Sequence, residues 1–104
     1  MSVIDEVGAE MSRQVAKWGI QNHSSYTRSD VSSHGAPITA HLAKRICDLK
    51  SDAGVVSWTD IFLEEVMEAV EEAQNGDLEK LRTELVQCAA VAVSWAESID
   101  RNNK

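Results

Sequence analysis

Three glutamates and one glutamine form the pattern in this sequence that could do chemistry. Glu65 and Glu68 lie in the segment EEVME at residues 64–68, and Glu84 and Gln87 lie in the segment ELVQ at residues 84–87. Carboxylate and amide oxygens are hard ligands, which suit Mg²⁺ or Mn²⁺ better than zinc. The two segments therefore predict a divalent-cation site, provided that the fold brings them together.

The first segment is predicted to lie in a helix over residues 58–75. Ser57 and Asp60 have the spacing of a capping box at its start, and Asn75-Gly76 is a favoured helix stop. At 100° per residue, the apolar side chains take one side of this helix. The other side is an acidic arc of about 120° that consists of Glu64, Glu65, Glu68, Glu71 and Glu72.

The acidic arc contains no lysine or arginine that would neutralise it. Like charges four residues apart, as in Glu64/Glu68 and Glu68/Glu72, each cost a few tenths of a kcal/mol in a helix. Helix stability alone therefore does not explain the pattern. Two interpretations follow: a solvated acidic face on an acidic protein, or a surface that holds a cation.

A second helix is predicted from residue 78 to about residue 100. Asp77 is a suitable N-cap, and no glycine or proline interrupts the chain from there to Asn102. Between residues 85 and 96 only Gln87 and Ser94 are polar, so this helix should be buried on several sides. Glu84 emerges from an apolar stripe, where an unpaired carboxylate is costly.

The short link at residues 75–77 predicts an antiparallel hairpin of these two helices. In a hairpin that turns at residue 76, Glu68 and Glu84 lie at equal distances from the turn. Glu65, Glu68, Glu84 and Gln87 can then face one another. This geometry favours the cation-binding interpretation over the solvated face.

The rest of the chain adds two helices and a long connection. Residues 2 to about 18 and about 38–51 have apolar side chains at helical spacing. Residues 20–36 have no clear periodicity, so we expect either disorder or a functional loop there. No alternating strand pattern occurs. The sequence predicts a single all-α domain over residues 1–104, a four-helix bundle whose C-terminal hairpin carries the acidic site.

Composition limits the partners of such a domain. The 17 acidic and 10 basic residues give a net charge of -7, which opposes binding to nucleic-acid polymers. Cys47 and Cys88 lie in apolar helical settings and are expected to be buried thiols. No signal peptide or membrane-length apolar run is present, so we expect a cytoplasmic protein without membrane contact. The apolar last helix of so small a domain predicts a homodimer or homotetramer.

The hairpin resembles the all-α nucleoside triphosphate pyrophosphohydrolases, the superfamily of MazG, dimeric dUTPases and dCTP pyrophosphatases. Their signature is ExxE followed after a dozen or more residues by ExxD. Residues 65–68 match the first half, and residues 84–87 match the second half except that Gln87 stands at the aspartate position. The segment KWGIQNH at residues 17–23 is similar to the one that precedes the base pocket in dCTP pyrophosphatase-like members. The whole pattern resembles the short MazG-like proteins of bacteria and phages.

The resemblance implies a Mg²⁺-dependent hydrolase, with Mn²⁺ as a second possible ion. It would cleave the α-β phosphoanhydride of a nucleoside triphosphate and release a nucleoside monophosphate and pyrophosphate, in control of nucleotide pools. Glu65, Glu68, Glu84 and Gln87 would ligate the metal, and Glu64 is the candidate base, with Glu72 behind it. Candidate substrate-binding residues are Lys17, Trp18, Gln21, Asn22, His23, Lys44 and Arg82.

The glutamine at the fourth position is a departure of this sequence from the superfamily's motif. An amide oxygen can ligate Mg²⁺, but it brings no negative charge, so the site holds its metal less tightly or holds fewer metals. The alternative function is that of a helical oligomer with the same fold that binds nucleotide or a partner protein without turning it over.

Overall fold

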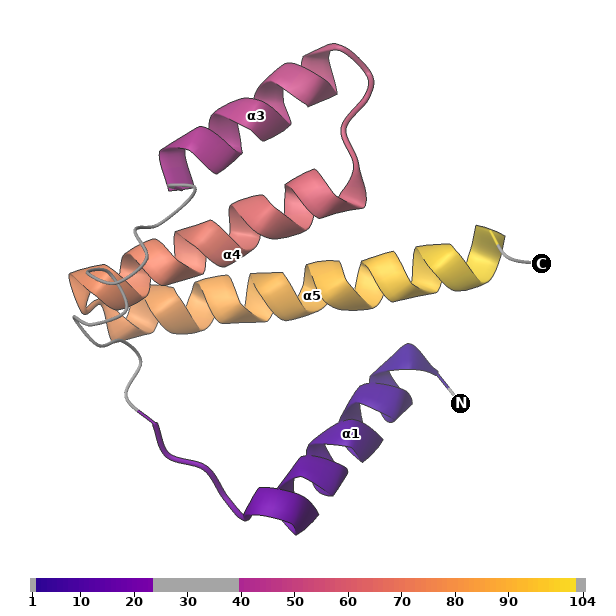
Figure 1. The fold of residues 1–104 in the computed structure, drawn as a ribbon, viewed down its shortest axis with the longest axis vertical. Helices are drawn as coiled ribbons and strands as arrows, with labels where there is room; N and C mark the ends of the chain where they lie inside the picture. Colours follow the sequence, from indigo (N-terminus) through magenta and orange to yellow (C-terminus); the bar gives the residue numbers. More distant parts are fainter. Residues whose placement is uncertain (1, 24–39, 103–104) are drawn as a thin grey trace.

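The protein is all-helical in the computed structural model, which describes residues 2–23 and 40–102. Its helices are α1 (Val3–Trp18), α3 (Ala40–Asp52), α4 (Trp58–Asn75) and α5 (Leu78–Asn102) (Figure 1). Over these described residues, the prediction of an all-α fold with four helices is confirmed. Most of the 20–36 connection and the predicted start of α3 at residue 38 lie outside the described residues.

Helices α4 and α5 form the predicted antiparallel hairpin and lie side by side (Figure 1). The Ser57 hydroxyl accepts a hydrogen bond from the Asp60 N–H at 3.3 Å, and the Asp60 carboxylate accepts one from the Ser57 N–H at 3.0 Å. Gly76 ends α4 with φ 73° and ψ 15°, a left-handed conformation that glycine adopts without strain. Asp77 then caps α5 by accepting from the Lys80 N–H at 3.0 Å.

Helix α3 packs on α4 and completes a three-helix core. The buried residues among those described are Ala43 and Cys47 of α3, Ala69 of α4 and Leu81 of α5. Across the hairpin, the rings of Phe62 and Trp95 meet edge to face, with centres 6.1 Å apart. Trp95 is therefore a packing residue between the two helices.

An ion pair ties α3 to α4 at the end opposite the hairpin turn. The Lys50 ammonium lies 3.0 Å from the Asp60 carboxylate, whose side chain is only 11% exposed. Asp60 therefore takes part both in the capping box of α4 and in the ion pair with α3. Sequence spacing predicted the cap and gave no sign of the ion pair.

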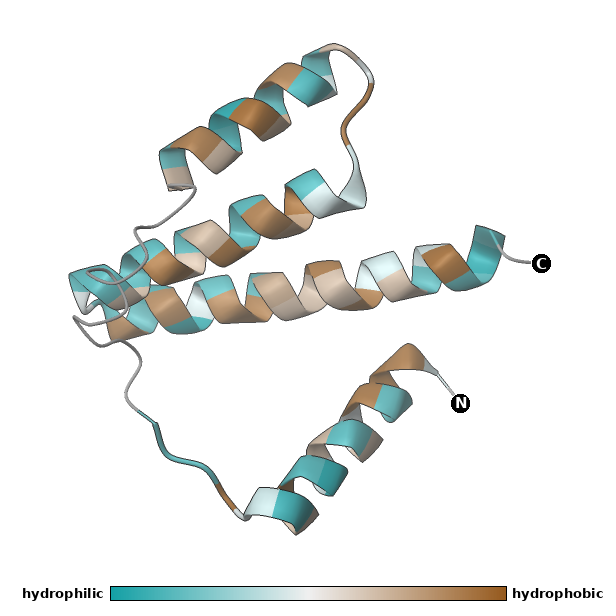
Figure 2. Ribbon diagram, in the orientation of Figure 1, coloured by the Kyte–Doolittle hydropathy of each residue, from teal (hydrophilic) through white to brown (hydrophobic). Residues whose placement is uncertain are grey.

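Helix α1 lies beside α5 and contacts little else. Its N-terminal end approaches the C-terminal half of α5, and its C-terminal end points away from the hairpin (Figure 1). Apolar residues remain exposed on α1, and α5 is hydrophobic along much of its length (Figure 2). The prediction that α5 is buried on several sides is thus not met within one chain. Leu85 and Val86 of this helix are 52% and 57% exposed. None of these helices has the length and hydropathy that a membrane span requires.

Candidate metal centre

Glu65, Glu68 and Glu84 converge at the seam of the hairpin. Each contributes one carboxylate oxygen to a group in which all three oxygens lie within 4.8 Å of one another. All three residues are half-buried. Glu65 and Glu68 share a face of α4 because they are three residues apart. Glu84 joins them because Gly76 reverses the chain halfway between residues 68 and 84.

Gln87 lies against two of these carboxylates, at the position predicted for the fourth ligand. With its amide nitrogen facing the cluster, Gln87 donates hydrogen bonds to Glu65 Oε2 at 3.0 Å and to Glu84 Oε2 at 3.3 Å. With its amide oxygen facing the cluster, it meets only acceptors. The first orientation suits a cluster without a cation, and a cation between the oxygens would favour the second.

The carboxylates are electrostatically crowded. Burial raises the pKa of Glu68 to about 7, and the nearby charges of Glu65 and Glu84 add to this rise. Burial likewise raises the pKa of Glu65, with a further contribution from the charge on Glu84. No lysine or arginine within residues 2–23 and 40–102 forms an ion pair with the three glutamates. Binding of a positive charge, whether a proton or a metal ion, would therefore reduce the repulsion among the three carboxylates and stabilise the cluster.

Glu64 lies at the edge of this cluster, where α3 meets α4. Its charge contributes to the raised pKa values of Glu65 and Glu68. Burial and a hydrogen bond with Glu64 raise the pKa of the Cys47 thiol to about 11. The thiol is thus a neutral donor to the candidate base. Sequence reasoning placed Cys47 in the core and missed this contact, because spacing along the chain does not reveal how α3 docks on α4.

The chemistry of the donor set suits a hard divalent cation such as Mg²⁺, because every candidate ligand atom is an oxygen. An octahedral Mg²⁺ with oxygen ligands at about 2.1 Å holds neighbouring oxygens about 3.0 Å apart. Three carboxylate oxygens within 4.8 Å of one another would draw closer together around such an ion. Rotation of the Gln87 amide would add a fourth oxygen. The remaining positions would be left to water and substrate.

The predicted substrate-binding residues do not gather around the cluster. Lys17 and Trp18 are at the end of α1, with the Lys17 ammonium 4.7 Å from the centre of the Trp18 ring. Gln21, Asn22 and His23 follow α1 as exposed residues. The C-terminal end of α1 points away from the hairpin (Figure 1), so the segment predicted to bind the base is apart from the carboxylates within one chain.

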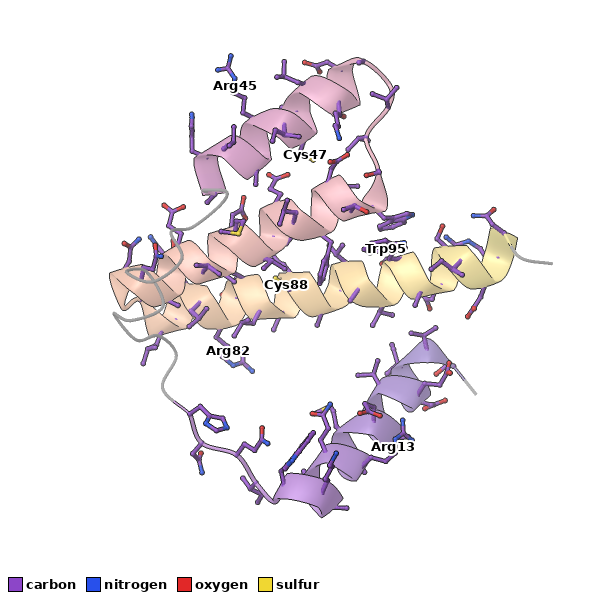
Figure 3. The ribbon with its side chains drawn as sticks, viewed as in Figure 1. Arg13, Arg45, Cys47, Arg82, Cys88 and Trp95 are labelled. Carbon is purple, nitrogen blue, oxygen red and sulfur yellow. The ribbon has the colours of Figure 1, made fainter. Side chains whose placement is uncertain are left out.

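The side chains of the two other predicted phosphate-binding residues, Lys44 and Arg82, also point away from the acidic cluster. Lys44 is exposed on α3, where its ammonium lies 3.7 Å from the Asp48 carboxylate. Arg82 projects from the side of α5 that faces away from α4 (Figure 3). Arg82 precedes Glu84 by two residues, and a rotation of about 200° separates their directions on a helix. The described part of the chain thus brings together the candidate metal ligands and Glu64, and leaves the phosphate-binding candidates outside.

Comparison of the chain with protein-family models, with curated proteins and with solved structures gives no match. The likeness to the MazG-like superfamily therefore depends on the motifs alone and stays a prediction.

Proposed function

We propose that this chain is a Mg²⁺-dependent nucleoside triphosphate pyrophosphohydrolase of the MazG-like kind. The observation that supports it best is the convergence of Glu65, Glu68 and Glu84 within 4.8 Å, with the Gln87 amide against two of them. The segments that supply these residues are the two halves of the superfamily's motif. Their meeting in a helical hairpin is what that motif requires.

The reaction adds water across the α-β phosphoanhydride. The water oxygen forms a new bond to phosphorus as the bridging P–O bond breaks, and a nucleoside monophosphate and pyrophosphate leave. A bound Mg²⁺ supplies charge neutralisation of the phosphates and lowers the pKa of a water molecule. Glu65, Glu68, Glu84 and Gln87 would hold the ion, and Glu64 at the edge of the cluster would accept the proton of the attacking water.

Glu64 is suited to this role by its surroundings. The neutral Cys47 thiol is beside it in a buried part of the α3–α4 interface, where it can hold the carboxylate in place without adding a positive charge. A lysine or arginine in that position would lower the basicity of Glu64. Glu72 remains the second candidate for the base.

The second candidate function is nucleotide or partner binding without turnover, in an oligomer of the same fold. Two observations favour it. Gln87 gives the site one negative charge fewer than the superfamily's motif would, and the residues expected to bind the nucleotide lie apart from the carboxylates within one chain. The two functions differ in one measurable property, which is the release of pyrophosphate.

The deciding experiment incubates the purified protein with canonical and modified nucleoside triphosphates and Mg²⁺, and measures pyrophosphate together with nucleoside monophosphate. We expect release that depends on Mg²⁺ and falls at least about 100-fold in Glu68→Ala, since loss of a metal ligand removes most of the activity. The matched control is Glu71→Ala, which removes an exposed glutamate from the same helix and should leave the rate unchanged. Absence of release from every substrate would refute the enzyme.

Gln87→Asp provides the complementary gain of function. The aspartate restores the negative charge of the superfamily's motif, so half-maximal activity should occur at a Mg²⁺ concentration about 10-fold lower, equivalent to about 1.4 kcal/mol. If the wild-type protein is inactive but binds a non-hydrolysable nucleotide in calorimetry, the second function is supported instead.

A further inference from the structure

Gln87 makes a hydrogen-bonded link across the seam between α4 and α5. Its amide nitrogen donates to Glu65 Oε2 of α4 at 3.0 Å and to Glu84 Oε2 of its own helix at 3.3 Å. A primary amide has two N–H groups, so one is available for each carboxylate. Gln87 therefore ties together two of the clustered glutamates, one from each helix of the hairpin.

The amide suits a cluster that no charged side chain neutralises. The ion pairs within residues 2–23 and 40–102 all involve other carboxylates. The neighbouring Cys88 thiol is neutral as well, because burial and the charges of Glu65 and Glu84 raise its pKa. Hydrogen bonds from an amide to an ionised carboxylate are stronger than those between neutral groups. The N–H groups of Gln87 thus stabilise carboxylates that repel one another.

The same side chain can serve a loaded site without any movement of the backbone. A half-turn about the last side-chain bond exchanges the oxygen and the nitrogen of the amide, and this torsion is a soft one. The two atoms are similar in size, and Gln87 is itself exposed, so the half-turn needs no repacking of the core. Gln87 therefore has one arrangement for carboxylates alone and another for carboxylates around a cation.

We propose that Gln87 positions Glu65 and Glu84 in the metal-free site and reverses its amide when a divalent cation binds, so that its oxygen faces the ion. The inference rests on the proposed function only in requiring a cation at Glu65, Glu68 and Glu84, and it does not depend on hydrolysis. The N–H groups and the cation bind the same carboxylates, so each weakens the binding of the other. Loading is then a local exchange at one side chain, and the hairpin keeps its shape when the ion is absent.

Nuclear magnetic resonance of the side-chain amides tests the reversal directly. The Gln87 signals are identified by their absence from Gln87→Met, and the exposed Gln74 of α4 is the control within the same spectra. Without divalent ions, the Gln87 N–H groups should exchange with water at least about 5-fold more slowly than those of Gln74. Saturating Mg²⁺ should abolish this difference and shift the signal of the Gln87 amide carbon, while the Gln74 signals stay in place.

Two results would overturn the inference alone. One is equal exchange of Gln87 and Gln74 in the metal-free protein, and the other is a Gln87 amide that stays protected although the backbone signals of Glu65 and Glu68 show that Mg²⁺ has bound. Backbone signals that Mg²⁺ does not move would refute the metal centre together with the reversal. A reversal without pyrophosphate release would support the inference and refute the hydrolase, so the two proposals fail separately.

Variants of Gln87 give a second measurement. Gln87→Met has a similar length and no N–H to donate, so its Tm without divalent ions should fall by about 2–6 °C, whereas Gln74→Met should change the Tm by less than about 2 °C. Gln87→Glu adds a repelling charge and should melt lowest of all without Mg²⁺. It should also gain the most from Mg²⁺, because its carboxylate is always available as a ligand. A Gln87→Met protein that melts with the wild type would overturn the role of the amide in the metal-free site.

Discussion

Neutralising Glu68 should make the metal-free protein more stable, and only at a pH where Glu68 is charged. The perturbation is Glu68→Gln, which keeps the size and polarity of the side chain and removes one of three crowded charges. Glu68 has an ordinary pKa of 4.5 when the chain is unfolded and a pKa of about 7 in the folded protein. A raised carboxyl pKa means that folding favours the protonated form.

The sign and the pH window follow from this difference. The stability that Glu68 contributes is fully present below pH 4.5 and is lost as the pH rises through 7. Above that pH Glu68 is charged in both states, and burial beside other carboxylates makes the charge more costly in the folded state. At full strength the loss is about 3 kcal/mol. The carboxylate keeps contact with solvent, and screening reduces the expected loss to about 1–2 kcal/mol.

Thermal unfolding without divalent ions measures the effect. At pH 8 the Tm of Glu68→Gln should exceed that of the wild type by about 5–10 °C, since 1 kcal/mol shifts the Tm of such a domain by about 4–8 °C. At pH 4 the two proteins should melt together. The control Glu71→Gln removes an exposed charge from the same helix and should change stability by less than about 0.5 kcal/mol at either pH.

Added Mg²⁺ should reverse the order at pH 8. An ion that binds only the folded state at one hundred times its dissociation constant stabilises by about 2.7 kcal/mol, which exceeds the deficit of about 1–2 kcal/mol, and the variant with one ligand fewer should gain much less. A variant that melts at or below the wild-type temperature at pH 8 would refute the account, because the three carboxylates would then not repel one another.

Two further predictions concern the frame that holds the cluster. Cys47 should react with iodoacetamide at pH 8 about 100-fold more slowly in the folded protein than in urea, because a pKa raised from 9.0 to about 11 leaves little thiolate; equal rates by peptide mass spectrometry would contradict its burial beside Glu64. Ser57→Ala should lower the Tm by about 4–8 °C, since a lost N-cap costs about 1 kcal/mol. Ser57→Asp keeps an acceptor at the cap and should melt close to the wild type in the same scan. A Tm unchanged in Ser57→Ala would contradict the role of the capping box.

Local features of the fold could be predicted from the sequence because their causes are local. The capping residues Ser57 and Asp77 and the stop at Gly76 fixed the bounds of the hairpin helices, and the structure confirms them. A turn centred on residue 76 then made Glu68 and Glu84 neighbours by counting alone. The acidic cluster was accessible to sequence reasoning for this reason.

Long-range placement could not be predicted in the same way. The Lys50 to Asp60 ion pair and the contact of Cys47 with Glu64 depend on the orientation in which α3 packs on α4. Helical periodicity in the sequence does not specify this orientation. The same limit applies to Lys17, Lys44 and Arg82, which were chosen for charge alone. Their directions are set by helix orientation, and none is brought to the carboxylates.

By itself, the sequence determined the two hairpin helices, their caps and the four residues that meet between them, because 100° per residue and a glycine turn are local rules. Only the tertiary structure decided how crowded the carboxylates are and which way α1 points. It also decided which apolar faces one chain leaves open. These properties depend on burial, which is a property of the whole packed molecule and not of any single segment.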